Sequence, residues 1–173
     1  MKEKSFSEIE QEAWDQRAGY YDELFVPISI QAIPSILDGL GSLAGKRHLD
    51  VACGTGHLVA AAAQRGAISE GIDFAEAMIE VARENYPGQK YNQADATQLP
   101  FDDASFDAVT CAFGLSHLEY PQEAVDEAFR VLAPGGRFAF TLWFGPDDGN
   151  ELMAIVKGAV TAHTVTPVLL PES

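Results

Sequence analysis

The residues best suited to chemistry begin with two glycines, Gly54 and Gly56, which stand between an apolar segment and an alanine-rich one. Glycine allows the backbone to pass close to a ligand, and the start of a following helix favours polar or anionic groups. The same turn also occurs where tight geometry alone requires glycine. Taken alone, the pair predicts either a ligand-binding loop or a plain strand-to-helix turn.

Two acidic residues follow later predicted strands. Asp73 comes after Gly71 and Ile72, roughly 20 residues after the glycines, where a carboxylate can accept hydrogen bonds from ribose hydroxyls. Its alternative role is to cap the next helix. Asp95 precedes Ala96 at the end of the third predicted strand, where an acid can accept a hydrogen bond from an adenine amino group. Its alternative role is that of a solvated turn residue.

A candidate general base follows the fourth predicted strand. His117, with Glu119 beside it, comes a few residues after that strand, so we expect it near the carboxyl edge of the sheet, within reach of a reacting acceptor. The alternative is that His117 packs in a loop and satisfies a backbone group. His48, His57 and His163 show no mutual spacing typical of a metal site, and no metal is predicted.

Alternating strands and helices must position these residues. Periodicity and turn residues predict strands at 47–52, 67–72, 90–94, 106–113 and 137–143, and helices at 58–65, 75–85 and 121–132. Two helices precede them, at 5–25 with a weak point at Gly19 and at 28–43. This alternation is typical of βαβ units. We therefore predict an α/β fold with a doubly wound, mostly parallel sheet and an N-terminal helical cap.

Length and composition limit the class of protein. The 173 residues are 47% apolar, which fits one domain. With 26 acidic against 11 basic side chains, the net charge of −15 disfavours nucleic acid and anionic lipid as partners. No apolar run reaches the roughly 20 residues of a spanning helix, and the first residues differ from a signal peptide. Since Cys53 and Cys111 are also few and far apart, we expect a cytoplasmic protein with no membrane partner.

Six segments of the chain resemble, in order, the successive motifs of class I S-adenosylmethionine-dependent methyltransferases. They are LDVACGTG (49–56), GIDFAEAM (71–78), ADA (94–96), LPF (99–101), SFDAV (105–109) and VLAPGGR (131–137). The nearest group is the ubiquinone/menaquinone-biosynthesis C-methyltransferase type, and the match covers about residues 47–143. The resemblance implies a Rossmann-like fold, S-adenosyl-L-methionine as cofactor, and methyl transfer to a small-molecule acceptor.

The resemblance also implies how the methionine end of the cofactor is held. The backbone around Ala52, Gly54, Thr55 and Gly56 would cradle it, with Asp50 bracing the loop. Many relatives carry glycine at the position of Ala52, although alanine is a common variant.

For the nucleoside end, the resemblance assigns the ribose to Asp73. Phe74 and Met78 would line the adenine pocket, and Asp95 with Ala96 would hold the adenine edge.

Two further regions would lie near the reacting centre. Ala112, at the end of the fourth strand, would lie under the sulfonium. Residues 14–22 resemble the family's N-terminal segment, which closes over the cofactor, and either Tyr20 or Tyr21 would face the cation there. Each tyrosine has a core position as its alternative role.

The resemblance divides the single domain (1–173) into a helical cap at 1–45, a cofactor-binding core at 46–144 and a C-terminal helix and tail at 145–173. Relatives continue after the fifth strand with two antiparallel strands, which these last residues have no room to form. We expect a truncated form whose fifth strand lies at the sheet edge and pairs with a second copy as a homodimer.

Two alternatives to a methyltransferase stay open. An NAD-dependent oxidoreductase shares the glycine turn and the ribose acid, but Val59 stands where its third glycine belongs, and Asp95 with Ala96 has no role there. The other alternative is a binding module that keeps the cofactor fold without turnover.

Overall fold

A parallel sheet of five strands organises the computed structural model, which describes residues 4–143. The strands are β1 (Arg47–Val51), β2 (Ile68–Asp73), β3 (Lys90–Gln93), β4 (Phe106–Ala112) and β5 (Leu132–Thr141). They lie in the order β3-β2-β1-β4-β5, and every neighbouring pair is parallel. The order reverses between β1 and β4, and ligands of such sheets bind beyond the carboxyl ends of the strands at this point. The predicted Rossmann-like, doubly wound fold is confirmed.

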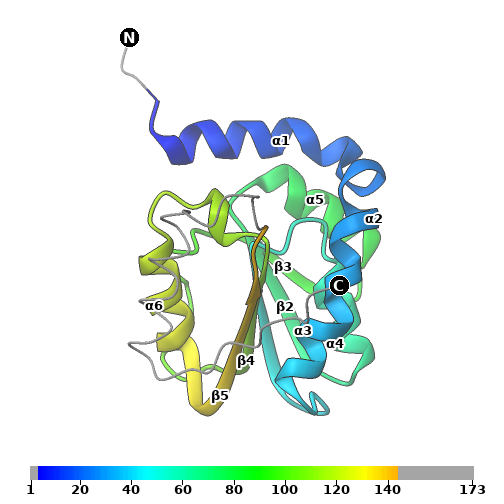
Figure 1. Cartoon of the computed structure of the whole chain (residues 1–173), viewed down its shortest axis with the longest axis vertical. Coiled ribbons are helices and arrows are strands. Elements are labelled where there is room, and N and C mark those ends of the chain that lie inside the picture. Colours follow the sequence, from blue (N-terminus) through cyan, green and yellow to red (C-terminus); the bar gives the residue numbers. More distant parts are fainter. Residues whose placement is uncertain (1–3, 144–173) are drawn as a thin grey trace.

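Helices cover both faces of the sheet (Figure 1). On one side α6 (Pro121–Val131) packs Val125 and Val131 onto Leu49 and Val109 of the central strands. The other side carries α3 (Ile33–Leu40), α4 (His57–Gln64) and α5 (Glu76–Asn85). Both faces of β1 and β4 are therefore buried, as is usual in a parallel sheet covered by helices.

The fifth strand begins earlier than predicted. β5 follows α6 directly at Leu132, and its register against β4 shifts, since Phe106 pairs with Leu132 while Ala108 pairs with Arg137. Residues 133–136, which include the predicted Pro-Gly-Gly turn, form the irregularity. Among the described residues β5 pairs only with β4 and lies at the sheet edge. Pairing of this edge with a second copy stays a prediction, and the predicted C-terminal helix and tail lie outside the described residues.

The N-terminal helices differ from prediction in two places. α1 (Phe6–Leu24) is one continuous helix, so the expected weak point at Gly19 is wrong. A capping box of Ser5 and Glu8 starts it, and Ala18, next to Gly19, is buried against the core.

The predicted helix at 28–43 is instead three pieces: α2 (Val26–Ser29), a 3-10 turn η1 (Ile30–Ala32) and α3. Pro27 and Pro34 lie in the first turns of α2 and α3, where proline is tolerated. Gly41, with φ 76°, ends α3.

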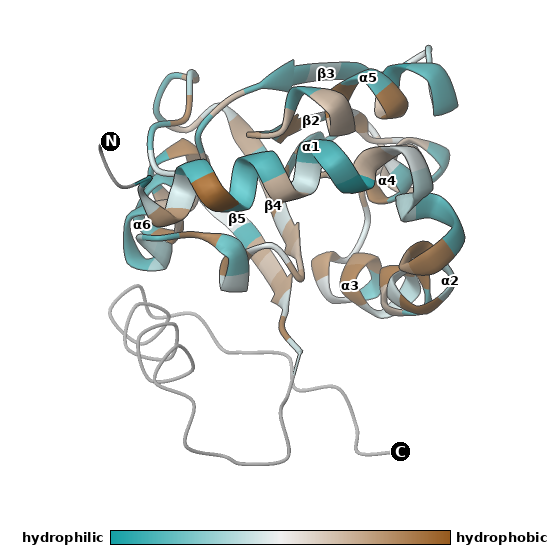
Figure 2. Ribbon diagram, turned by 90° about the horizontal axis from the view of Figure 1, so that it is seen from above, coloured by the Kyte–Doolittle hydropathy of each residue, from teal (hydrophilic) through white to brown (hydrophobic). Residues whose placement is uncertain are grey.

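α1 lies across the top of the molecule, over the carboxyl ends of the strands (Figures 1 and 2). Its middle contacts the β2–α5 junction, because Gln11 Nε2 donates to the Phe74 carbonyl at 3.0 Å and Asp15 Oδ1 accepts from the Ala77 amide at 3.1 Å. The helical cap therefore closes the side on which a ligand of this fold binds.

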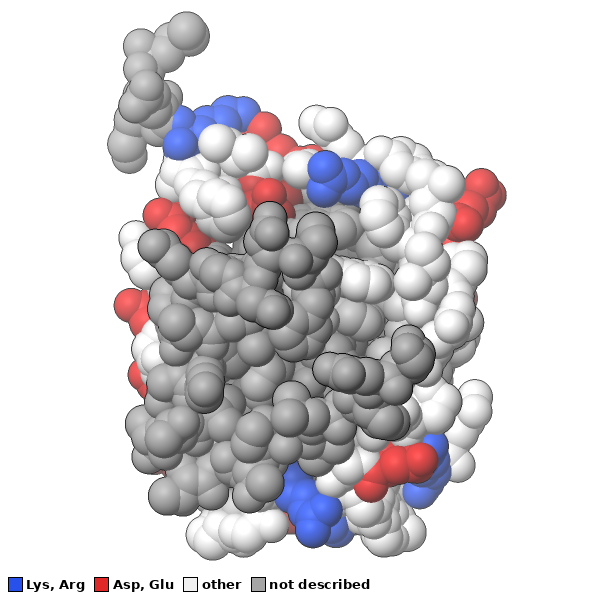
Figure 3. Space-filling model, in the orientation of Figure 1, with Lys and Arg blue, Asp and Glu red and all other residues white. Residues whose placement is uncertain are grey.

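The described residues contain no single helix long and apolar enough to cross a membrane. By length and composition alone, one pair of segments bent by 60°, Phe6–Leu24 with Val26–Leu40, passes the same test. Figure 3 shows acidic and basic side chains scattered along the margins of one face, without a single-sign patch among its described residues.

Candidate functional site

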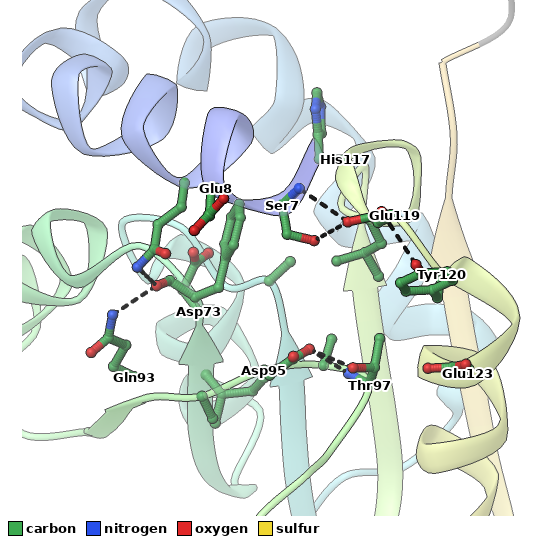
Figure 4. A pocket seen from close by; sticks show the side chains of 17 residues that line it. Ser7, Glu8, Asp73, Gln93, Asp95, Thr97, His117, Glu119, Tyr120 and Glu123 are labelled. Carbon is green, nitrogen blue, oxygen red and sulfur yellow. Dashed lines mark hydrogen bonds between the residues drawn. The ribbon is translucent and has the colours of Figure 1, made fainter. Parts of the chain in front are cut away.

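A cavity of about 510 Å³ lies between the N-terminal half of α1 and the carboxyl ends of the strands (Figure 4). Its walls come from three parts of the chain: the start of α1, the ends of β1, β2 and β3, and the 3-10 turn η2 (Leu115–His117) with the start of α6. Of the predicted cofactor residues, the cavity brings together Ala52, Asp73, Phe74, Asp95 and Ala96.

Asp73 lies at the end of β2 and is 5% exposed. Its Oδ2 accepts from the Gly54 amide at 2.9 Å, and its Oδ1 accepts from the Ala75 amide at 3.0 Å. Burial raises the pKa of Asp73 to about 6, although these backbone hydrogen bonds oppose the rise. Asp73 thus ties the glycine loop to the residue that precedes α5. It does not cap that helix itself, because the N-cap residue is Ala75, whose side chain makes no capping hydrogen bond. A carboxylate has about four lone-pair positions, so it can still accept from a ribose hydroxyl.

The glycine loop adopts conformations that favour glycine. Gly54 has φ 51° and Gly56 has φ 88°, and Ala52 also lies in the left-handed region at φ 56°. A Cβ at Gly56 would lie 2.6 Å from the Tyr91 hydroxyl, whereas a Cβ at Gly54 would only touch the Tyr21 ring at 3.8 Å. Gly56 is therefore required by both packing and backbone conformation, whereas Gly54 is favoured by its backbone conformation alone.

The third strand leads into the adenine side of the predicted site. Asp95 is exposed and lines the cavity, and its Oδ1 accepts from both the amide and the hydroxyl of Thr97 at 2.8 Å. Ala96 beside it is 4% exposed and packs into the core. The second carboxylate oxygen of Asp95 makes no hydrogen bond within the described residues, so it can accept one from a ligand.

Several predicted residues lie away from the cavity. Met78 packs in the core beneath α1, and Ala112 packs against the cluster formed by α3 and α4. Tyr20 is 44% exposed, whereas Tyr21 lies against the glycine loop and stacks on Phe25 with ring centroids 5.5 Å apart. Tyr21 is thus the tyrosine placed beside the loop, because it points inward from α1.

Asp50 and Thr55 are buried parts of the scaffold. Asp50, 2% exposed, accepts from Thr110 Oγ1 of β4 at 2.6 Å. Thr55, 1% exposed, donates its hydroxyl hydrogen bond to Asp22 of α1. The side chain of Asp50 therefore joins β1 to β4, and that of Thr55 joins the glycine loop to α1.

Asp22 fastens the C-terminal end of α1 to the glycine loop. Besides Thr55, it accepts from Asn85 Nδ2 at 2.8 Å and lies 3.2 Å from His57 Nε2. Partial burial alone would raise the pKa of Asp22, but the hydrogen bonds from Thr55, Asn85 and His57 outweigh it, so the pKa is lowered. Sequence reasoning missed this anchor, although Asp22 ends the segment predicted to close over the cofactor.

His117 fastens the other end of α1. Its Nδ1 lies 2.9 Å from Glu10 Oε2, and its ring meets the Trp14 ring edge-on at 4.8 Å between centroids. Figure 4 shows the imidazole rising from the cavity rim, away from Asp95 and Thr97. Contact with a side chain of α1 was not foreseen, because the pairing spans elements far apart in sequence.

The charge of the cavity is one-sided. Five carboxylates line it, contributed by Glu8, Asp73, Asp95, Glu119 and Glu123, and no Lys or Arg is among the described residues of its lining. Such a wall attracts a cation and repels a phosphate group. Among the described residues, no group of three or more His, Cys, Asp or Glu side chains is placed to hold a metal ion.

Fold and site together define a Rossmann-like domain with a cavity beneath a helical cap. Residues 49–140 match the family model described as the methyltransferase domain, and the chain belongs to that family.

A demethylmenaquinone methyltransferase of Clavibacter sepedonicus is 51% identical over 98 residues, which cover 55% of this chain and 40% of that protein. One of Thermus thermophilus is 42% identical over 146 residues, covering 75% of this chain and 66% of the relative. The chain thus spans less than two thirds of the curated relatives it matches.

Among solved structures, an S-adenosylmethionine-dependent methyltransferase from Mesorhizobium loti is 30% identical, with a TM-score of 0.59 over 63% of this chain and 52% of the other.

Proposed function

We propose that this protein binds S-adenosyl-L-methionine in the cavity beneath α1 and transfers its methyl group to a small-molecule acceptor. The observation that carries the proposal is the cavity wall, whose described residues contribute five carboxylates and no Lys or Arg. A sulfonium cofactor adds positive charge to this wall, whereas the pyrophosphate of NAD would meet only repulsion. The family match over residues 49–140 supports the same conclusion.

The residues present fit such a cofactor. Asp73 and Asp95 each retain acceptor capacity at the nucleoside end, and Phe74 also lines the cavity. The glycine loop, with Gly54 facing the Tyr21 ring, would hold the methionine end. When bound, the cofactor supplies an electrophilic methyl group on a positively charged sulfur. The protein then has to align donor and acceptor and exclude water.

α1 provides the exclusion of water. It is fastened at one end by Asp22 to the glycine loop and at the other by Glu10 to His117. A catalytic role for His117 stays a prediction, and its contacts with Glu10 and Trp14 support a role in holding α1 over the site.

The acceptor is proposed from the relatives. Their names make demethylmenaquinone the first acceptor to test. The experiment is a transfer assay with methyl-labelled cofactor, the full chain and that acceptor. Label in the acceptor supports the proposal. Tight cofactor binding without transfer to any of a panel of quinone, phenol and amine acceptors supports the alternative of a non-catalytic binding module.

A further inference from the structure

Four buried polar side chains form a continuous chain across the sheet, beneath the glycine loop. Ser69 of β2 pairs in register with His48 of β1, and Asp50 of β1 pairs with Thr110 of β4. The distances are 2.7 Å from Ser69 Oγ to His48 Nδ1, 2.9 Å from His48 Nε2 to Thr110 Oγ1 and 2.6 Å from Thr110 Oγ1 to Asp50 Oδ1. None of the four is more than 7% exposed.

The chemistry of these groups gives the chain a direction. An ionised Asp50 only accepts, so the Thr110 hydroxyl donates to it. Thr110 Oγ1 must then accept from His48, which places the imidazole proton on Nε2 and leaves Nδ1 to accept from Ser69. Burial lowers the pKa of His48 to about 4, so the ring is neutral at pH 7. All three hydrogen bonds therefore point toward Asp50.

Asp50 lies two positions before Ala52, which lines the cavity. Burial raises its pKa to about 7, the nearby Asp73 adds to the rise, and the hydrogen bond from Thr110 opposes it. The titratable groups whose charges act with that of Asp50 are Tyr21 of α1, Cys53 of the glycine loop, Asp73 of β2, Tyr91 of β3 and Cys111 of β4. None of these groups is a cation, so the described residues around Asp50 leave its negative charge uncompensated.

We propose that the chain Ser69–His48–Thr110 positions Asp50 as an ionised carboxylate beneath the glycine loop, where its charge balances that of a cationic cofactor. The inference rests on the proposed function and adds positioning residues to it. Uptake of one proton by Asp50 reverses the direction of these hydrogen bonds. Asp50 then donates to Thr110, Thr110 donates to His48 Nε2, and the imidazole proton resides on Nδ1. The tautomer of His48 thus reports whether Asp50 is ionised, the state that would balance the charge of the cofactor.

Nitrogen NMR of ¹⁵N-histidine in the full chain tests the reversal. In the ligand-free protein, His48 should carry its proton on Nε2 above about pH 8 and shift toward Nδ1 as the pH falls through the range in which Asp50 takes up its proton. At the lower pH, saturating S-adenosylmethionine should return the proton to Nε2. A tautomer unchanged by both pH and cofactor would overturn the proposal.

A matched pair of variants tests the effect on binding. Thr110→Val removes the hydroxyl at nearly constant volume, and Thr110→Ser keeps it. Calorimetry at pH 7 should show a Kd for S-adenosylmethionine roughly tenfold higher in Thr110→Val, the scale of one lost hydrogen bond to a charged group. Thr110→Ser should stay within about twofold of the parent. The Thr110→Val defect should shrink near pH 9, where Asp50 ionises without help.

The uncharged nucleoside 5′-methylthioadenosine separates charge from packing. Its affinity should be the same in the parent chain and in Thr110→Val. An equal loss for both ligands would show a merely structural role and overturn the inference. Failure of the parent chain to bind S-adenosylmethionine would contradict the proposed function itself. If Thr110→Val does not fold, the NMR titration of the parent chain decides.

Discussion

The Gly54 amide donates a hydrogen bond to Asp73 Oδ2 at 2.9 Å, and this contact ties the end of β2 to the glycine loop. The carboxylate that is predicted to hold the ribose therefore also shapes the loop that holds the rest of the cofactor. Binding and local stability are thus coupled at a single side chain.

Asp73→Asn should lower both the affinity for the cofactor and the thermal stability of the protein. Loss of the charged acceptor is expected to weaken S-adenosylhomocysteine binding by about 1.5 to 3 kcal/mol. The Tm should fall as well, because the asparagine amide nitrogen cannot accept, so one of the Gly54 and Ala75 amides loses its acceptor. Asp95→Asn is the matched control, since its exposed side chain bonds only Thr97 and should cost affinity with little change in Tm. A lower Tm with unchanged affinity in Asp73→Asn would show that Asp73 has only a structural role at the glycine loop and the start of α5.

Substitutions at the two loop glycines should have different effects, on stability at Gly56 and on cofactor binding at Gly54. Gly56→Ala meets the Tyr91 hydroxyl at 2.6 Å, so it should destabilise the empty protein, and adding Tyr91→Phe should recover part of the loss. A Cβ at Gly54 meets only the Tyr21 ring at ordinary contact distance. Gly54→Val should therefore lower the free energy of unfolding only by the strain of a positive φ, about 1 to 2 kcal/mol, while its branched side chain should block cofactor binding. Unimpaired binding in Gly54→Val would show that the loop does not approach the ligand.

Asp22→Ala should loosen the cap without dismantling the core. Its three partners, Thr55, His57 and Asn85, lose their link to α1, so the cofactor should dissociate faster and α1 should lose protection from hydrogen exchange. Glu23→Ala, an exposed neighbour on the same helix, is the control. Stopped-flow dissociation rates that are equal in the two variants would show that Asp22 does not close the site.

The stability of the ligand-free protein should fall as pH rises from about 5 to 8. Asp50 and Asp73 have pKa values raised from 3.8 to about 7 and about 6, so between these limits the folded chain holds protons that the unfolded chain has released, and rising pH favours unfolding. His48, lowered from 6.5 to about 4, acts in the opposite direction and only below about 6.5. Above about pH 6.5, the ionisation of Asp50 dominates the pH dependence of stability.

Thermal melts between pH 5 and 8 test whether stability falls as the pH rises. Asp50→Asn should flatten the upper part of the curve, because the amide does not titrate. A Tm that rises steadily from pH 6.5 to 8 in the parent chain would contradict the assignment of a buried, uncompensated acid.

Sequence alone predicted a doubly wound parallel sheet and two of the five acids that line the cavity, Asp73 and Asp95, because these follow from local patterns. Alternating strands and helices imply a parallel sheet, and the ends of parallel strands meet at one edge. Asp73 and Asp95 were therefore placed correctly at the cavity although they come from different strands. The roles assigned to them stay predictions.

Side-chain direction on helices was harder to predict. Met78 follows the motif of its relatives but points beneath α1 into the core, and choosing Tyr21 over Tyr20 required the rotation of α1 about its axis. The sequence does carry one signal that was not used: His48 and Asp50 alternate with apolar residues in a strand buried on both faces. Buried polar groups require hydrogen-bond partners, and here the neighbouring strands provide them in Ser69 and Thr110.

The central claim is that the acidic cavity takes a sulfonium cofactor and not a dinucleotide. Isothermal titration of the full chain with S-adenosylmethionine, S-adenosylhomocysteine and NADH tests it most directly. The account predicts one molecule of either sulfur nucleoside bound per chain and no heat from NADH. Saturable binding of NADH, with no binding of either sulfur nucleoside at millimolar concentration, would contradict it.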